Sequence, residues 1–137
     1  MEMKFGLLCD AANESREGKL NILGEFNTIW AGGFPVRWPR CVLVARFEAH
    51  PSEGQDHDLV LRLTDRDGAD IIPSPPRLPI RFAQAAPDMP LRAQVVVNLD
   101  GMTFERPGEF EYHLVVDGHH RGSVPIWVRP RQKPAEA

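Results

Sequence analysis

The sequence is poor in the residues on which metal and thiol sites are usually built. Its 137 residues include only two cysteines, Cys9 and Cys41, and neither belongs to a Cys-x-x-Cys motif or lies close to a histidine. The pattern therefore gives no start for a zinc site or for thiol catalysis. Both cysteines lie in apolar, strand-like segments, where a free cysteine behaves as a small buried hydrophobic residue. A disulfide needs the two strands to be neighbours, and an intracellular location argues against it.

Long apolar runs and a charge of one sign are also missing. No apolar stretch approaches the roughly 20 residues that cross a bilayer, and the N-terminus "MEMKFGLLCDAANES" lacks the features of a secretory signal. We therefore expect a cytoplasmic protein. The formal net charge of -3, mixed in sign, argues against a general electrostatic attraction to nucleic acid or to an anionic membrane. The partners that we expect accordingly include neither nucleic acid nor membrane.

Catalytic templates are absent as well. No serine lies in a G-x-S-x-G motif, and "WAGGFPVRW" has two adjacent glycines without the lysine and helix of a phosphate-binding loop. We expect no catalytic residue, no metal ligand and no cofactor, and so a protein that is not an enzyme. An enzyme whose site is assembled from residues far apart in the sequence stays open as an alternative.

The chain is rich instead in strand and turn signals. Thirteen prolines and eleven glycines separate short segments in which apolar and polar residues alternate. In "CVLVARFEA", for example, Leu43, Ala45 and Phe47 are expected to point inward and Arg46 and Glu48 outward. No window predicts an amphipathic helix. The pattern predicts one all-β domain over residues 1–130, an antiparallel, immunoglobulin-like β-sandwich of about seven to nine short strands, followed by a disordered tail over residues 131–137. A small closed barrel is the alternative.

Three segments carry a resemblance to known proteins. They are the opening "LLCDAA", the strand "GKLNILGEF" and the hairpin "PGEFEYHLVVDG". Over residues 3–129 the chain resembles a widespread family of small uncharacterised bacterial proteins, a domain of unknown function with an immunoglobulin-like β-sandwich. The resemblance implies a bacterial protein and supplies no catalytic residues. Within that fold, Tyr112 is the counterpart of a tyrosine corner, with its hydroxyl bonded to nearby backbone.

Two Asp-Gly pairs have the appearance of chemical sites. In "VDGHHRG", residues 116–122, adjacent histidines of an extended chain point to opposite sides, so His119 and His120 do not readily chelate one ion. Asp-Gly between alternating runs predicts the turn of a hairpin there. "TDRDGAD" lacks the glycine and glutamate that a calcium loop beginning at Asp65 needs, and we interpret it as a second hairpin that leads into "ADII".

The most informative segment outside the expected core is "IWAGGFPVRWPR", residues 29–40. It concentrates aromatic side chains between glycines and prolines, and exposed apolar loops tend to mark contacts. Trp127 by alternation faces away from the core, near Val115. The candidate contact surface consists of Trp30, Phe34, Arg37, Trp38 and Trp127. The alternative is that the loop rings cap an open end of the sandwich and that a loop covers Trp127.

These features predict a non-enzymatic protein-binding or assembly module with an unknown protein partner. Pro125 lacks the amide proton of a central strand, so the last strand is expected to be an edge, which also allows a homodimer through it. A carbohydrate- or small-ligand-binding sandwich is the first alternative, because the same tryptophans would serve as stacking platforms.

Overall fold

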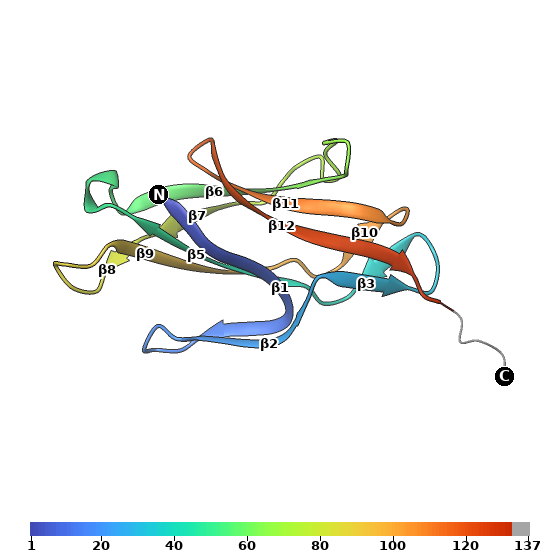
Figure 1. The fold of residues 1–137 in the computed structure, drawn as a ribbon, viewed down its shortest axis with the longest axis horizontal. Helices are drawn as coiled ribbons and strands as arrows, with labels where there is room; N and C mark the ends of the chain where they lie inside the picture. The colour runs from blue at the N-terminus through green and yellow to red at the C-terminus, as the bar shows by residue number, and fades with distance from the viewer. Residues whose placement is uncertain (133–137) are drawn as a thin grey trace.

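The computed structural model describes residues 1–132 as two packed layers of β-strands with one 3-10 turn, η1 (Pro51–Glu53) (Figure 1). The all-β sandwich expected from the alternation is confirmed. The strands are β1 (Glu2–Glu14), β2 (Leu20–Phe26), β3 (Thr28–Ala31), β4 (Val36–Trp38), β5 (Val42–Ala49), β6 (Asp56–Thr64), β7 (Arg77–Arg81), β8 (Ala83–Gln84), β9 (Leu91–Asn98), β10 (Met102–Phe104), β11 (Gly108–Val116) and β12 (His119–Pro130). Of the predicted tail, all but residues 131 and 132 lies outside the described residues.

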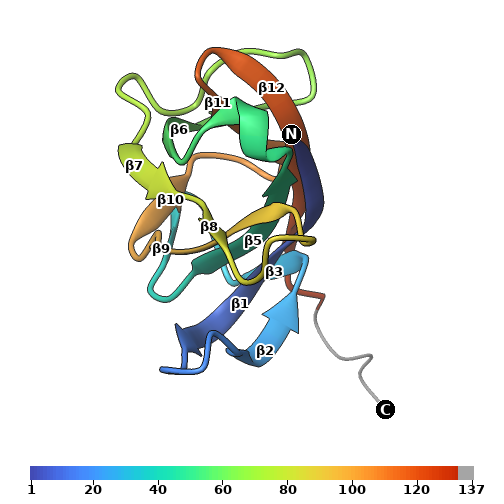
Figure 2. The same cartoon turned by 90° about the vertical axis from the view of Figure 1, so that its left-hand side faces the viewer.

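The strands form two open five-stranded sheets. Sheet A has the order β2-β1-β5-β9-β8 and sheet B the order β3-β12-β11-β6-β7, while β4 and β10 pair as a separate ribbon. All neighbours are antiparallel except β3 and β12, which are parallel. Figure 2 shows β6, β11 and β12 stacked over β5, β8 and β9. Because both sheets end in free edges, the closed-barrel alternative is excluded. The immunoglobulin-like assignment stays a prediction.

The core lies between the two inner faces and follows the predicted alternation closely. Leu43, Ala45 and Phe47 of β5 are buried, whereas Arg46 and Glu48 point outward, as expected. Strands β6, β9, β11 and β12 alternate in the same way. Their buried residues include Leu59, Leu61, Leu63, Leu91, Ala93, Val95, Phe110, Tyr112, Leu114, Val116, Val124, Ile126 and Val128. Each large apolar side chain buried here stabilises the fold by about 1.5–3 kcal/mol.

The β1–β2 hairpin covers part of the outer face of sheet A. Strand β1 pairs first with β5 and then, from Leu8 onward, with β2, so the hairpin arm runs back below the sheet in Figure 1. Its tip is held by the Gln94 Nε2 group of β9, which donates to the Gly18 carbonyl at 2.9 Å. Val44 points to this outer side and is nevertheless fully buried. The cover explains why β5 is an uninterrupted buried run at Leu43, Val44 and Ala45.

A single glycine makes the bend of this arm. Gly24 has φ of +69°, and a Cβ at this position would overlap the Asp10 carboxylate on the neighbouring strand. Only glycine adopts this conformation without strain and also leaves room for the carboxylate. Gly24 therefore gives the arm a local backbone conformation that other residues do not readily adopt, without shifting the register of β1 and β2.

The final strand is an edge over only part of its length. Residues Trp127–Pro130 pair with β3, whereas no strand within residues 1–132 pairs with the outer side of β12 around Pro125. The missing amide proton of Pro125 therefore leaves no ladder bond unmade. The homodimer through this strand stays a prediction, and the C-terminal third of β12 is already paired within the chain.

Two local expectations are wrong. The Tyr112 side chain is fully buried, but its hydroxyl has no hydrogen-bond partner, so Tyr112 does not form a tyrosine corner. The segment "ADII" is not a strand, because only Asp70 bridges back to Thr64 and the next strand begins at Arg77. The turn before it does form: the Asp65 carboxylate accepts hydrogen bonds from the amides of Asp67 and Ala69.

The two cysteines are free and buried, as predicted. Burial raises the pKa of Cys41 to about 12 and also raises that of Cys9, so both remain protonated thiols at neutral pH. A protonated, buried thiol is a poor nucleophile. In residues 1–132, no helix has the length and apolar character that spanning a membrane requires.

Candidate functional site

The outer face of sheet B carries two tryptophans side by side at its β3 edge. In β3, Ile29 and Ala31 are buried in the core, so the alternating residues Thr28 and Trp30 point outward. The parallel register places Trp127 opposite Thr28 and Arg129 opposite Trp30. Side chains of paired residues share a face of a sheet. We name this group of Thr28, Trp30, Trp127 and Arg129 the Trp face.

The Trp face combines exposed indole surface with a fixed positive charge. The side chain of Trp30 is 50% exposed, and Trp127 is half-buried. The Arg129 guanidinium lies over the Trp127 ring, 4.9 Å from the ring centroid, within the range of a cation–π interaction. This stacking holds the guanidinium in place while leaving its N–H groups free to donate outward.

Two hollows flank the Trp127 ring. One, of about 340 Å³, is lined by Asn27 together with the four residues of the Trp face. The other, of about 200 Å³, is also lined by Trp127 and Arg129 and extends to Gly108–Phe110 of β11. It brings in charges of both signs, with Asp65, Asp67 and Glu109 against Arg66 and Arg106. The surface around Trp127 is therefore uneven, aromatic at its centre and polar at its rim.

The structure brings together only two of the five predicted contact residues, Trp30 and Trp127. Phe34 and Trp38 are half-buried against the core, and Trp38 packs on Phe26 with ring centroids 6.3 Å apart. Arg37 is exposed, and its side chain lies across Gly101. The loop rings thus follow the alternative reading, in which they close one end of the sandwich.

The position of Trp127 also differs from the one expected. Trp127 is paired with Glu109, at the far end of β11 from Val115. The register of the hairpin produces this difference, because β12 runs back along β11 from its tip at Asp117 and Gly118. Arg129, which the sequence-based reasoning missed, could have been found by alternation, since it stands two residues after Trp127 and shares its face.

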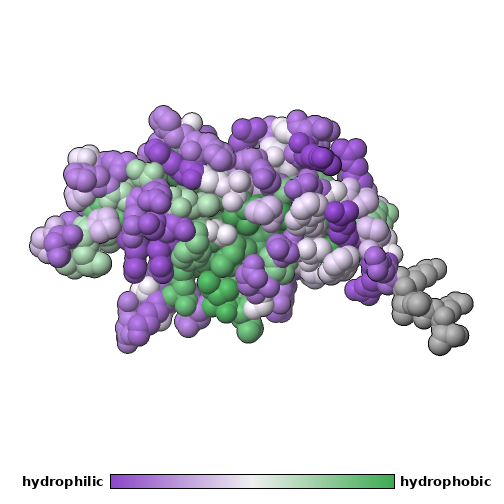
Figure 3. All heavy atoms as spheres, in the orientation of Figure 1, coloured by the Kyte–Doolittle hydropathy of each residue, from purple (hydrophilic) through white to green (hydrophobic). Residues whose placement is uncertain are grey.

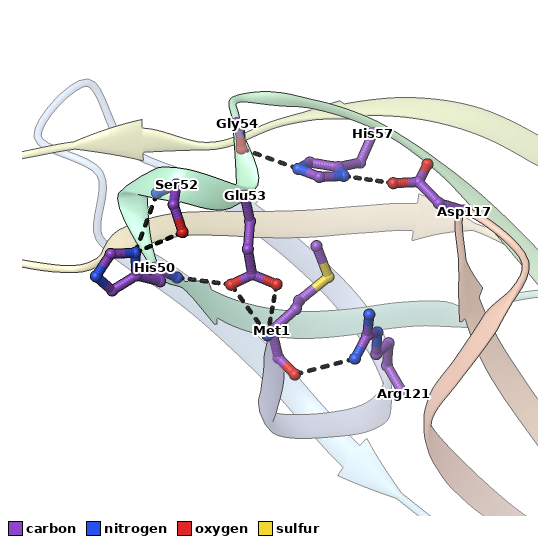
Figure 4. A network of polar contacts seen from close by, with 8 residues as sticks. All are labelled: Met1, His50, Ser52, Glu53, Gly54, His57, Asp117 and Arg121. Carbon is purple, nitrogen blue, oxygen red and sulfur yellow. Dashed lines mark hydrogen bonds and ion pairs between the residues drawn. The ribbon is translucent and has the colours of Figure 1, made fainter.

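A second polar cluster lies at the other end of the sandwich (Figure 4). The His57 Nδ1 group contacts the Asp117 carboxylate at 2.5 Å, and its Nε2 group contacts the Gly54 carbonyl at 2.9 Å. Asp117 also accepts a hydrogen bond from the Asp58 amide at 2.9 Å. Because both partners of the ring only accept hydrogen bonds, both ring nitrogens donate, and His57 is held in its cationic form.

The pKa values of this pair fit that assignment. Burial acts to lower the pKa of His57, but the hydrogen bonds to Asp117 and Gly54 outweigh it and raise the pKa. The hydrogen bond from the Asp58 amide, followed by that from His57, lowers the pKa of Asp117. With both ring nitrogens donating to protein acceptors, His57 has no lone pair with which to act as a general base. The cluster ties the 54–58 segment to the last hairpin and is structural.

The same end of the molecule holds the Met1 amine. This amine donates to the two oxygens of Glu53 at 2.8 and 3.1 Å, and Arg121 donates to the Met1 carbonyl at 3.4 Å. Glu53 in turn caps η1 through the His50 amide at 2.7 Å. Figure 4 shows these contacts, but the network is not complete, because the Nε atom of Arg121 is buried without a hydrogen-bond partner among the described residues.

The Asp-Gly hairpin predicted at "VDGHHRG" is confirmed. Val116 pairs with His119, which leaves Asp117 and Gly118 as a two-residue turn with φ of 50° and 81°. Positive φ at both positions is the signature of the turn that joins twisted antiparallel strands. Within residues 1–132, no three His, Cys, Asp or Glu side chains gather in a way that could hold a metal ion.

Comparison with known proteins identifies the family. A family model described as a family of unknown function (DUF6941) matches residues 4–129, nearly the whole chain. The chain therefore belongs to this family, and the resemblance seen in the sequence is confirmed. No curated protein matches the chain at a significant level.

Proposed function

We propose that this member of the DUF6941 family is a non-enzymatic protein-binding module, and that it contacts its partner through the Trp face. The exposure of Trp30 beside Trp127 and Arg129 is the observation that supports the proposal. Tryptophan and arginine are the residues that most often dominate binding energy at protein interfaces. A partner that covered Trp30 would remove from water one of the largest apolar surfaces that the described chain exposes.

The mixed charges around the Trp127 ring suit a protein partner. The rim of an interface is usually polar, with an aromatic and arginine-rich centre. Here the indoles and Arg129 form the centre, and Asp65, Glu109 and Arg106 supply a rim with both signs. Such a rim favours one orientation of a partner with complementary charges and disfavours others.

A second apolar patch on the molecule provides the control. Ile22 and Leu23 of β2 and Val96 of β9 are 38%, 70% and 38% exposed. Figure 3 shows apolar surface gathered in this region, below the centre of the view. This patch has no aromatic side chain stacked with a cation, so we assign it less weight as a binding centre.

A capture experiment with matched variants tests the proposal. Three purified proteins are each incubated with a lysate of the native host: the unchanged protein, the Trp30→Ala variant and the Leu23→Ser variant. We expect a specific protein to be retained by the unchanged protein and by Leu23→Ser, and to bind Trp30→Ala at least about tenfold more weakly, as for an interface hot spot. Equal retention by the unchanged protein and both variants would contradict the proposal.

Carbohydrate binding is a second candidate, and one observation favours it. The 340 Å³ hollow combines two indole rings with the polar side chains of Asn27, Thr28 and Arg129. Aromatic rings that present an apolar face beside polar groups suit the alternating apolar and hydroxyl surfaces of a sugar. Retention on immobilised glycans, lost in Trp30→Ala, with no protein captured from the lysate, would support this candidate instead.

The same proposal places the protein in the bacterial cytoplasm. The bacterial origin rests on the family resemblance of the sequence. The two free and buried cysteines support a reducing compartment, because secreted domains of this size commonly use their cysteines in disulfides.

A further inference from the structure

Two histidines from neighbouring strands meet on the outer face of sheet B. The Nδ1 atom of His113 in β11 lies 3.0 Å from the Nε2 atom of His120 in β12, and the ring centroids are 5.1 Å apart. His120 is exposed, and His113 is half-buried. A regular hairpin register does not predict this contact, because His113 stands directly opposite Ser123.

A β-bulge brings the two rings together. Leu114 pairs with Gly122, but the next residue, Val115, pairs with His120, so Arg121 is an extra residue in β12. Without the bulge, His120 would stand opposite Val116, whose side chain lies in the core. The insertion therefore turns His120 onto the outer face, beside His113. Bulges commonly re-aim side chains in this way.

The bulge is itself fixed by packing against the first strand. Gly122 lies directly under the Met3 side chain, so closely that a Cβ at this position would overlap the methionine. The half-buried Met3 also packs against the hydrophobic core. The orientation of His120 is thus set by the body of the sandwich rather than by a free loop.

The second nitrogen of His113 is also held. Its Nε2 atom lies 2.9 Å from the hydroxyl oxygen of Thr64, which is 5% exposed, and 3.6 Å from the Glu111 carboxylate. Both neighbours can accept a hydrogen bond from a protonated Nε2 atom, so they stabilise the tautomer of His113 with its proton on Nε2. That tautomer leaves the lone pair of Nδ1 directed toward His120. Metal-binding histidines are oriented by the same kind of contact.

We propose that His113 and His120 form an open site for a divalent transition metal of the zinc or nickel type, bound through Nδ1 of the first and Nε2 of the second. Tetrahedral Zn²⁺ with Zn–N bonds of about 2.0–2.1 Å places two ligand nitrogens about 3.3 Å apart, a few tenths of an ångström more than the distance here. Small rotations of the exposed His120 ring supply the difference.

Water completes the coordination, because the described chain offers two protein ligands at this point and no third. Arg62, which stands opposite His113 in β6, is paired with Asp70 at 2.9 Å, which reduces its repulsion of a bound ion. An ion held by two imidazoles and water binds more weakly than one in a closed structural zinc site and exchanges its water ligands freely. The site is separate from the Trp face and does not depend on the function proposed for it.

Calorimetric titration of the untagged protein with Zn²⁺, and separately with Ni²⁺, tests the site. We expect one ion per chain, and a loss of at least about tenfold in affinity for His120→Ala. His119→Ala is the matched control, because it removes a neighbouring histidine of the same hairpin, and its affinity is expected to stay unchanged. Trp30→Ala is expected to bind the ion normally.

A conservative change at the supporting hydroxyl separates positioning from ligation. Thr64→Val retains the shape of the side chain but cannot hold His113, and we expect its affinity for the ion to fall by about 10- to 100-fold. Thermal melting of each variant without metal confirms that it is folded. Absence of binding at millimolar metal, or equal affinity in the unchanged protein and His120→Ala, would overturn the proposal.

Discussion

The buried hydroxyl of Tyr112 leads to a sharp prediction about stability. Tyr112 is fully buried near the centre of the core, and its hydroxyl oxygen has neither a donor nor an acceptor within reach. Removing water from a hydroxyl without replacing its hydrogen bonds costs about 1–3 kcal/mol. Tyr112→Phe removes this cost and keeps the ring that packs the core.

The opposing effect of the substitution is small. Loss of one oxygen atom leaves a void on the order of 15 Å³, which costs roughly 0.4 kcal/mol at about 24 cal/mol per Å³. We therefore expect Tyr112→Phe to raise the free energy of unfolding by about 1 kcal/mol. For a chain of this length the midpoint of thermal unfolding then rises by about 4 °C.

Urea unfolding followed by tryptophan fluorescence measures the change directly. The slope of free energy against urea must stay the same for the comparison to hold. Tyr112→Ala serves as the control for packing and is expected to lose about 3–5 kcal/mol. If Tyr112→Phe instead loses 1 kcal/mol or more, the hydroxyl is hydrogen-bonded in solution, and the tyrosine corner expected from the sequence is restored.

Two further predictions concern the hairpin bend and the histidine clamp. Gly24→Ala is expected to destabilise the fold by more than about 1 kcal/mol, because alanine is strained at this φ and overlaps Asp10, whereas Gly33→Ala, which meets no atom within 4 Å, changes little. Urea unfolding measures the free energy of unfolding of both variants, and equal values for Gly24→Ala and Gly33→Ala would refute the account of Gly24. Because folding raises the pKa of His57, the stability that its charged form contributes is fully present below about pH 6.5. This stability is lost as the pH rises through the pKa of the folded protein. Because folding lowers the pKa of Asp117, the stability that its carboxylate contributes is present above about pH 4. This stability is lost as the pH falls through the pKa of the folded protein. Asp117→Asn should therefore lose more stability, relative to the unchanged protein, at pH 5.5 than at pH 9, and a loss independent of pH would contradict the clamp.

Alternation predicted the fold because most strands bury one face each. In β5 the pattern placed Leu43, Ala45 and Phe47 correctly, because the strand itself is regular and pairs with β9 without a register shift over these residues. The irregularity in the pairing with β1 lies in β1, between Met3 and Phe5. The same reasoning could not reveal that Val44, on the opposite face, is buried as well. Its cover comes from a hairpin that is adjacent in space and distant in sequence.

The candidate sites were predicted less well, and registers are the reason. The sequence identified Trp30 and Trp127 separately but contained no sign of the parallel pairing that joins them. His120 was interpreted from its neighbour His119, although its actual partner, His113, is selected by a bulge of one residue. A bulge changes which face a side chain occupies without leaving a clear local signal.

Cross-linking in the native host tests the central claim, that the Trp face contacts a protein partner. A photo-activated cross-linking residue is placed at Thr28, beside Trp30 on the Trp face, and in a second variant at Leu23, on the separate apolar patch. We expect illumination to give one discrete, larger adduct from position 28 that disappears when Trp30→Ala is added, and none from position 23. An adduct from position 23 alone, or no adduct from position 28 in cells that express the partner captured from lysate, would contradict the account.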